Sequence, residues 1–361
     1  MAIDCRIASC KPPGGVCRKC TRRRTRPFAA QVAHALLQIW PDDGESTMIA
    51  ARIGAAVAVA ALTAVVQAAP LAYVSNEGSG SVTVIDTATD RVVATWALGG
   101  KPRGIAISND GATLYVSDQD RNALVAVDTA TGKPSRTVPL GHSPEAIYLS
   151  HDGKWLTAAV EEDNTVAIID TATLSIAKRV TTRGKNPEHA VWSPDGSLIY
   201  ASAEEADSVD IIRVASGEVV KSVTVGNRPR GIGFLPDGSR AYVAAENADT
   251  VNVFDVARGE VIARIKAGAR SNGVIVHPDG KRVFVSSGGE GTVQVIDTAT
   301  NTIVAKIAVG KRPWNMALTP DGGKLYVACG RSNRAAVIDT ATNTKVADVE
   351  VGELPWGVAI H

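Results

Sequence analysis

Charged and aromatic side chains recur at one position of a repeated loop, directly after a proline or the residue that replaces it. In chain order, this position holds Arg103, Glu145, Glu188, Arg230, Asn272, Trp314 and Trp356. A purely structural position would carry the same residue type in every copy, so the variation indicates a binding surface. Carboxylates can hold a cationic group, guanidinium groups an anionic one, and indoles a planar or cationic one. The sequence therefore predicts a site for a zwitterionic or planar aromatic ligand, built from these seven residues.

Histidine accompanies glutamate in two of these loops. His142 and Glu145 lie in one loop, and Glu188 and His189 lie in the next. Because imidazole and carboxylate groups are common metal ligands, the four residues could hold a metal ion if the fold brings the loops together. The alternative is that they are separate, solvated loop residues. A second set of loops is acidic, contains Glu161, Glu204 and Glu246 and is expected on the same face.

No motif of a known catalytic mechanism accompanies these residues. Residues 69–361 contain no Gly-x-Ser-x-Gly, no His-Glu-x-x-His, no phosphate-binding loop and no Cys-x-x-Cys-His. We therefore predict no catalytic residue and no particular cofactor.

The loops recur because the chain repeats one unit seven times. The copies are spaced by 42 residues, with one spacing of 43, and start at Tyr73, Tyr115, Thr157, Tyr200, Tyr242, Phe284 and Tyr326. Each copy holds four short runs rich in Val, Ile and Thr, separated by Gly, Asn, Asp or Pro, which is typical of β-strands and turns. The pattern predicts an all-β, seven-bladed β-propeller with four antiparallel strands per blade. A β-solenoid is the alternative, but its repeats are usually about half as long or shorter.

A recurring tripeptide and a recurring tetrapeptide specify the turns. Pro-Asp-Gly, as at Pro194–Gly196, favours a tight turn in which Gly takes a positive φ. In Asp-Thr-Ala-Thr, as at Asp86, the carboxylate can accept hydrogen bonds from backbone N–H groups two residues on. The fourth copy departs from the second pattern, with Arg213 in place of the Asp.

The two ends of the repeat region complement each other. Leu71–Ser75 corresponds to the second strand of a blade, whereas Pro355–His361 corresponds to the innermost strand. The C-terminal strand is therefore expected to join the N-terminal blade and close the ring.

The charge is divided along the chain. Of the 38 Lys and Arg residues nine lie in residues 1–68, as do four of the 37 Asp and Glu, which leaves the repeat region with a net charge of −4. A mildly acidic propeller argues against general nucleic-acid binding. The repeat region contains one cysteine, Cys329, which is expected to be a buried apolar residue of a strand.

The N-terminal residues do not resemble the repeats. Residues 1–47 contain Cys5, Cys10, Cys17 and Cys20 and a run of arginines, so a zinc site is one interpretation and an untranslated or disordered leader the other. Residues 48–68 have the basic start, apolar run and small final residues of a secretory signal peptide. An uncleaved anchor is the alternative, although the run is short for a membrane span. The codons of Gly44-Glu45 form a purine-rich, ribosome-binding-like sequence two codons before Met48, which favours Met48 as the start.

This interpretation predicts an exported protein of residues 69–361, periplasmic or secreted. Edman sequencing of the exported protein should begin near Ala69. Recovery of peptides that contain Cys17 or Cys20 from cells would contradict a start at Met48.

The motifs Tyr-Val-Ser-Asn at 73–76, Val-Thr-Val-Ile-Asp-Thr-Ala-Thr at 82–89 and Pro-Asp-Gly resemble those of the YVTN-repeat β-propeller family. The resemblance covers residues 71–361. It implies a seven-bladed propeller and an exported bacterial or archaeal surface protein, and some relatives accompany pyrroloquinoline-quinone-dependent alcohol oxidation.

Three functions are compatible with the sequence. The first is a monomeric, non-enzymatic propeller that binds a small molecule or a periplasmic protein at the channel mouth, with no stable membrane span. The second is a hydrolase similar to the propeller lactonases, with a metal ion at the mouth. The third is an accessory or scaffold protein of a quinone-dependent dehydrogenase system.

Overall fold

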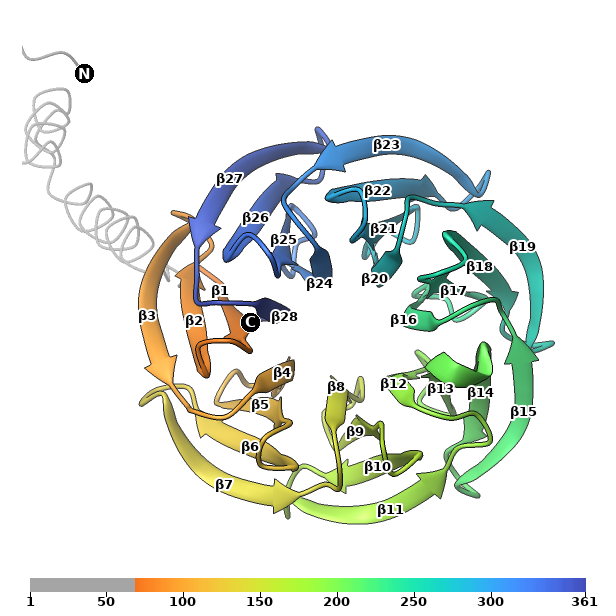
Figure 1. Ribbon diagram of the computed structural model, residues 1–361, viewed down its shortest axis with the longest axis horizontal. Helices are drawn as coiled ribbons and strands as arrows, with labels where there is room; N and C mark the ends of the chain where they lie inside the picture. The colour runs from red at the N-terminus through yellow and green to blue at the C-terminus, as the bar shows by residue number, and fades with distance from the viewer. Residues whose placement is uncertain (1–68) are drawn as a thin grey trace, which may run out of the picture. The chain divides into compact units, whose positions relative to one another are not determined.

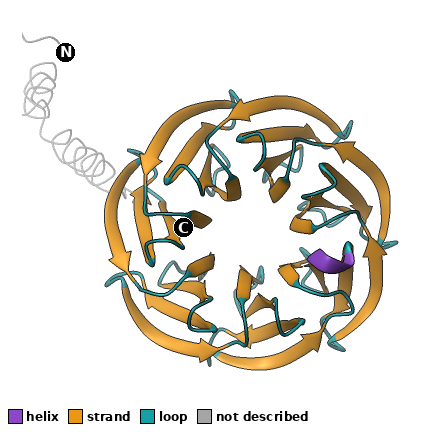
Figure 2. Ribbon diagram, in the orientation of Figure 1, coloured by secondary structure: helices purple, strands orange, loops and turns teal. Residues whose placement is uncertain are grey.

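Seven four-stranded antiparallel sheets surround a central axis in the computed structural model, which describes residues 69–361 (Figure 1). The chain thus forms the predicted all-β, seven-bladed propeller. The predicted leader and signal peptide lie outside the described residues. Figure 2 shows strands and loops almost throughout, with one short 3-10 helix at Glu204–Ala206.

Each blade runs from an innermost strand at the axis to a long outermost strand at the rim. From blade 1 to blade 7 the innermost strands are β28 (Pro355–Ile360), β4 (Pro102–Ile107), β8 (Pro144–Leu149), β12 (Pro187–Trp192), β16 (Pro229–Phe234), β20 (Ser271–Val276) and β24 (Pro313–Leu318). The second strands are β1 (Leu71–Asn76), β5 (Thr113–Asp118), β9 (Trp155–Val160), β13 (Leu198–Ala203), β17 (Arg240–Ala245), β21 (Arg282–Ser287) and β25 (Lys324–Cys329).

The outer half of each blade repeats in the same way. The third strands are β2 (Ser81–Asp86), β6 (Ala123–Asp128), β10 (Thr165–Asp170), β14 (Ser208–Arg213), β18 (Thr250–Asp255), β22 (Thr292–Asp297) and β26 (Arg334–Asp339). The outermost strands are β3 (Arg91–Ala97), β7 (Lys133–Pro139), β11 (Ser175–Thr181), β15 (Glu218–Thr224), β19 (Glu260–Lys266), β23 (Thr302–Ala308) and β27 (Thr344–Glu350).

Ring closure follows the prediction. The C-terminal strand β28 pairs antiparallel with β1, with Val74 opposite Val358, and completes the sheet β28-β1-β2-β3. Backbone hydrogen bonds of 2.7 and 3.1 Å between Leu71 and His361 hold the residue that follows β28. Blade 1 therefore contains both ends of the repeat region.

The turns have the predicted chemistry. Gly196 of a Pro-Asp-Gly turn has φ of 70°, a conformation that glycine adopts without the strain of a Cβ. The carboxylate of Asp86 accepts backbone hydrogen bonds from Ala88 at 2.8 Å and Thr89 at 3.0 Å. These contacts are local, so every repeat can form its own turns before the blades pack.

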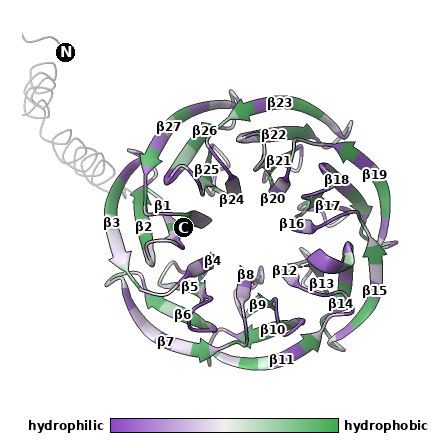
Figure 3. Ribbon diagram, in the orientation of Figure 1, coloured by the Kyte–Doolittle hydropathy of each residue, from purple (hydrophilic) through white to green (hydrophobic). Residues whose placement is uncertain are grey.

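The apolar core lies between neighbouring blades. One cluster combines Leu124 and Leu140 of blade 2 with Leu156 and Ile169 of blade 3, and equivalent clusters recur around the ring. Figure 3 shows green, hydrophobic residues on the strands away from the axis and more hydrophilic residues on the innermost strands. Each blade thus buries its faces only against its neighbours. Cys329 is buried in such a cluster, as predicted.

The described part of the chain contains no helix of the length and hydropathy that a membrane span requires.

Candidate functional site

The seven predicted site residues line one cavity of about 300 Å³ at the end of the channel where the innermost strands begin. The position after the proline is the second residue of each innermost strand, and not an exposed loop residue as we expected. Five of the seven are buried, and Arg103 and Trp314 are half-buried. Proline is compatible with the first residue of a strand because its missing N–H costs no ladder hydrogen bond there. The cavity therefore lies inside the channel mouth.

The residue that follows each second strand also faces this end of the channel. Its backbone N–H donates to a carbonyl of the preceding loop in all seven blades, for example from Glu161 to Ser143 at 3.0 Å and from Gly288 to Arg270 at 2.8 Å. In chain order the position holds Glu77, Gln119, Glu161, Glu204, Glu246, Gly288 and Gly330. Among these, Gln119, Glu161 and Glu204 line the cavity. Gln119 was missed from the sequence, although its place after the second strand was a signal that could have identified it.

Arg103 organises one side of the cavity. Its Nη1 donates to both carboxylate oxygens of Glu145 at 2.6 Å, and its Nε lies 3.3 Å from a carboxylate oxygen of Glu77. The guanidinium carbon also lies 5.8 Å from the ring centroid of Trp356. Gln119 donates from Nε2 to Glu145 at 2.5 Å. Glu145 is thereby fixed in a single orientation that points into the channel.

Arg230 is the centre of a second cluster of ion pairs in the cavity. Its guanidinium group forms ion pairs with Glu188 and Glu204, and its Nε donates to Glu246 at 2.9 Å. Two further arginines join from the loops before the innermost strands. Arg228 donates to Glu204 at 3.0 Å, and Arg312 donates to Glu246 at 2.7 Å.

The pKa values of the cavity glutamates show which carboxylates lack enough positive charge nearby to stay ionised. Burial and the charge of Glu188 raise the pKa of Glu204 to about 8. Burial, and after it the negative charge of Glu188, raises the pKa of Glu145 well above its usual value. Burial opposes ionisation of Glu188 too, but Arg230, His189 and Arg103 hold its pKa below the usual value. A cation near Glu145 would therefore replace the proton that this carboxylate otherwise retains.

Three carboxylates of the cavity lie close to one another. One oxygen each of Glu145, Glu161 and Glu188 lies within 4.8 Å of the others. Glu161 accepts a hydrogen bond from Ser143 at 2.9 Å, and in the part of the chain that the structure describes it has no ion-pair partner. This carboxylate trio is the one group of potential metal ligands found among residues 69–361.

The two histidines predicted as metal ligands are not members of the trio. His142 has a side chain that is 69% exposed, and its Nδ1 lies 2.8 Å from Asp163, whose hydrogen bond raises the pKa of the imidazole. His189 is buried, contacts the hydroxyl group of Tyr148 at 2.6 Å, and has its pKa lowered to about 4 by burial. The structure thus brings together Glu145 and Glu188 of the predicted four ligands, and adds Glu161.

Trp356 forms a floor beneath the cavity. Its indole stacks on the imidazole of His189, with ring centroids 6.3 Å apart, although the two residues come from blades 1 and 4. Trp356 lines both the cavity and a smaller hollow of about 70 Å³ further along the channel, whose other residues include Ile147 and Met316. Because its indole is packed on both sides, substitution of Trp356 would alter the channel itself as well as any binding.

Trp314 is held differently. Its indole lies directly over Gly330, where a Cβ would collide with the ring. The glycine after β25 therefore makes room for this tryptophan, and the indole remains half-buried at the edge of the cavity. Of the two tryptophans, Trp314 is the one with ring surface open to a ligand.

Solved structures with the same architecture have diverse descriptions. Hydrazine synthase of Kuenenia stuttgartiensis is 26% identical, with a TM-score of 0.69, over 74% of this chain and 92% of that chain. A functionally unknown protein from Desulfotomaculum acetoxidans DSM 771 is 19% identical, with a TM-score of 0.71, over 80% and 98%. A putative 6-phosphogluconolactonase from Bacteroides uniformis ATCC 8492 is 22% identical, with a TM-score of 0.68, over 82% and 100%. The last two likenesses show the fold alone.

No curated protein matches the chain significantly. The family of YNCE-like beta-propellers matches residues 40–361, which include all seven blades. The chain belongs to this family of YNCE-like beta-propellers, as a seven-bladed member with YVTN-type repeats.

Proposed function

We propose that this protein is an exported, non-enzymatic propeller that binds a small zwitterionic molecule with a planar or aromatic part in its central cavity. The observation that carries the proposal is the carboxylate trio of Glu145, Glu161 and Glu188, which faces a cavity that also contains arginines and an accessible indole. The cationic group of the ligand would occupy the trio. Binding of the ligand would be accompanied by release of protons from the cavity carboxylates whose pKa values are raised, Glu145 and Glu204.

The opposite charge of the ligand has candidate partners in the same cavity. Arg228 and Arg312 are half-buried, and each forms an ion pair on one edge of its guanidinium group. The remaining N–H groups can donate to a carboxylate of the ligand. Trp314 offers a ring face, and contact of a cation with an indole contributes about 0.5–2 kcal/mol.

The volume restricts the ligand to a small solute. A cavity of about 300 Å³ lies at the lower end of the usual range for small-molecule sites. Its lining includes four glutamates and four arginines, and an apolar ligand would leave Glu161 without an ionic partner among residues 69–361. Amino acids, betaines and aromatic amino acids have the required size and charge.

Calorimetric titration with such a panel of solutes tests the proposal. For the tightest binder, Glu161→Gln should weaken binding by about five- to tenfold, since a partly buried ion pair contributes about 1 kcal/mol or slightly more. The matched control is Glu162→Gln, which removes the same charge from the exposed neighbouring residue that does not line the cavity. Affinity should also increase with pH through the range in which Glu204 and Glu145 lose protons. Equal losses in the two variants, or an affinity that falls with rising pH, would contradict the proposal.

A divalent cation in the carboxylate trio, as in the hydrolase alternative, makes a different prediction. Three carboxylate oxygens suit hard cations such as Ca²⁺. Dialysis against a chelator would then abolish solute binding, and Ca²⁺ would restore it. Binding by arginine, glutamate and indole should instead be unchanged by the chelator.

A further inference from the structure

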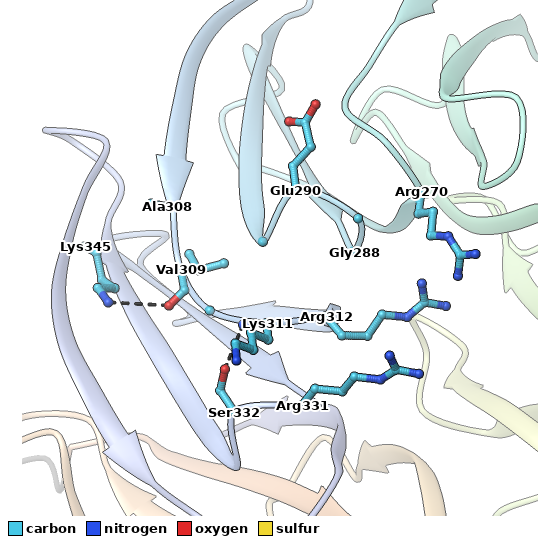
Figure 4. A pocket seen from close by; sticks show the side chains of 13 residues that line it. Arg270, Gly288, Glu290, Ala308, Val309, Lys311, Arg312, Arg331, Ser332 and Lys345 are labelled. Carbon is cyan, nitrogen blue, oxygen red and sulfur yellow. Dashed lines mark hydrogen bonds between the residues drawn. The ribbon is translucent and has the colours of Figure 1, made fainter.

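A second large cavity lies between blades 6 and 7 (Figure 4), and Arg312 belongs both to its lining and to that of the central cavity. Its volume is about 760 Å³. The charged residues of its lining are Arg270, Glu290, Lys311, Arg312, Arg331 and Lys345. Five of these six side chains are cationic, whereas the propeller as a whole is mildly acidic. This local excess of positive charge requires an explanation.

The excess arises from one position of the repeat. Directly after the second strand, blades 1 and 3–5 have glutamate, whereas blades 6 and 7 have Gly288 and Gly330. The backbone is the same, because Gly288 and Gly330 donate to the preceding loop at 2.8 and 3.0 Å as their glutamate equivalents do. Only the carboxylate is missing. In blade 5 the equivalent Glu246 binds Arg228, Arg230 and Arg312, which shows what a carboxylate at this position does.

Three cations of the cavity have no such partner. Lys345 pairs with Asp348 at 2.6 Å, Arg312 with Glu246 at 2.7 Å, and Glu290 with Lys306. By contrast, Arg270, Lys311 and Arg331 form no side-chain ion pair or hydrogen bond within residues 69–361; their interactions there come from the backbone, as in the 2.7 Å bond from the Lys311 N–H to Ser332. All three are exposed.

The guanidinium groups also point the same way. Figure 4 shows the side chains of Arg270, Arg312 and Arg331 extending in one direction from the β19–β20, β23–β24 and β25–β26 loops. Burial lowers the pKa of Arg312, and repulsion from Arg270 contributes to the same direction. The arginines are thus close enough to repel one another, and a bound anion would relieve that repulsion.

We infer that this cavity is a second binding site, next to the central one and sharing only Arg312 with it, for a small oxyanion with at least two negative charges, such as a phosphate monoester or pyrophosphate. Arginine forks match the paired oxygens of phosphate groups, and three unpaired cations require a multivalent anion for neutralisation. An extended polyanion is a poorer match, since the rest of the propeller has a net negative charge.

Inorganic pyrophosphate is the probe for the test, in calorimetric titrations of residues 69–361 at low salt. Binding should be one to one, should weaken steadily with added NaCl and should be absent with acetate, a monoanion of the same oxygen chemistry. Absence of pyrophosphate binding, or equal binding of acetate, would overturn the inference. Tighter binding of a decathymidylate oligonucleotide than of pyrophosphate would also overturn it, in favour of a nucleic-acid surface.

Variants locate the site. The double variant Arg270→Gln and Arg331→Gln should reduce pyrophosphate affinity at least about tenfold, because two charge-assisted contacts are lost. Gly288→Glu should do the same by supplying the carboxylate of the other blades; Gly288 does not have a positive φ, and its Cβ would lie 3.2 Å from the flexible Arg312 side chain. The control Arg258→Gln removes one exposed arginine from the β18–β19 turn, at the opposite end of the strands, and should change affinity less than twofold.

The two glutamine substitutions affect exposed side chains, so the variants should melt at the temperature of the unmodified protein. Equal effects of Arg258→Gln and the double variant would indicate net charge alone and would contradict a site between blades 6 and 7. Glu161→Gln in the central cavity should leave pyrophosphate binding within twofold, so failure of this inference is distinguishable from failure of the proposed central site.

Discussion

Removal of Leu354–His361 is expected to abolish cooperative unfolding of the propeller. The deletion removes β28, leaves blade 1 with three strands and exposes the edge of β1. It also removes Trp356, Val358 and Ala359 from the core. Because each large buried apolar side chain contributes about 1.5–3 kcal/mol to a total stability of about 5–15 kcal/mol, the remaining chain should not retain a closed ring.

Thermal unfolding followed by circular dichroism at 218 nm measures this effect. The control is a circular permutant that joins His361 to Pro70 by a short linker and opens the chain in the exposed β18–β19 turn. This permutant keeps every strand, and Leu71 and His361 are already hydrogen-bonded neighbours. A truncated protein with an unchanged melting temperature would show that closure by β28 contributes nothing to stability.

Arg230→Met is expected to destabilise the protein by about 3–5 kcal/mol at pH 8, the usual cost of leaving buried charge without its partner. Arg230 is buried and pairs with Glu188, Glu204 and Glu246. The neighbouring Arg228→Met is the control, because Arg228 contacts Glu204 and Glu246 but has a half-exposed side chain. Its loss should cost about 1 kcal/mol or less.

The loss of unfolding free energy caused by Arg230→Met should become smaller as the pH falls. Without Arg230 the pKa values of the glutamates in the folded protein rise above their unfolded values, so the folded state binds more protons than the unfolded state. Stability contributed by such groups is present at low pH and is lost as the pH rises through the folded pKa. Glu204, whose pKa is already about 8, shows this direction before any substitution. Urea unfolding at pH 5 and pH 8 measures the difference, and an equal loss at both values would contradict the electrostatic explanation.

Most of the architecture was predictable because its causes are local. The spacing of Val- and Ile-rich runs and of Pro-Asp-Gly turns predicted four strands per blade, and the structure confirms them. The correspondence of Leu71–Ser75 and Pro355–His361 to different strands of one blade predicted the closure by β28. The copies of a repeat can be compared with one another, and this comparison alone identified seven residues that line one cavity.

The burial of these residues was not predictable in the same way. We expected Trp314 and Trp356 in exposed loops, because the prediction placed both tryptophans in the loops that enter the innermost strands. In the structure the proline begins the innermost strand, and Trp356 packs against His189 from the far side of the channel. Trp356 is therefore unsuitable as a probe of binding alone, whereas Trp314 remains suitable.

The sequence by itself determined the number of blades, the order of their strands and the glycines that replace glutamate after β21 and β25. These features depend on hydrogen bonds and turns within about ten residues, which composition and period report directly. Only the tertiary structure decided which charges meet: Arg103 with Glu145, Arg230 with Glu188, and Glu161 in the place where histidines were expected. Both ion pairs join residues 42 positions apart in neighbouring blades, and Glu161 meets Glu188 of the next blade. They depend on the angle at which blades pack and on the side chains that fill the channel, and no local pattern encodes either of these.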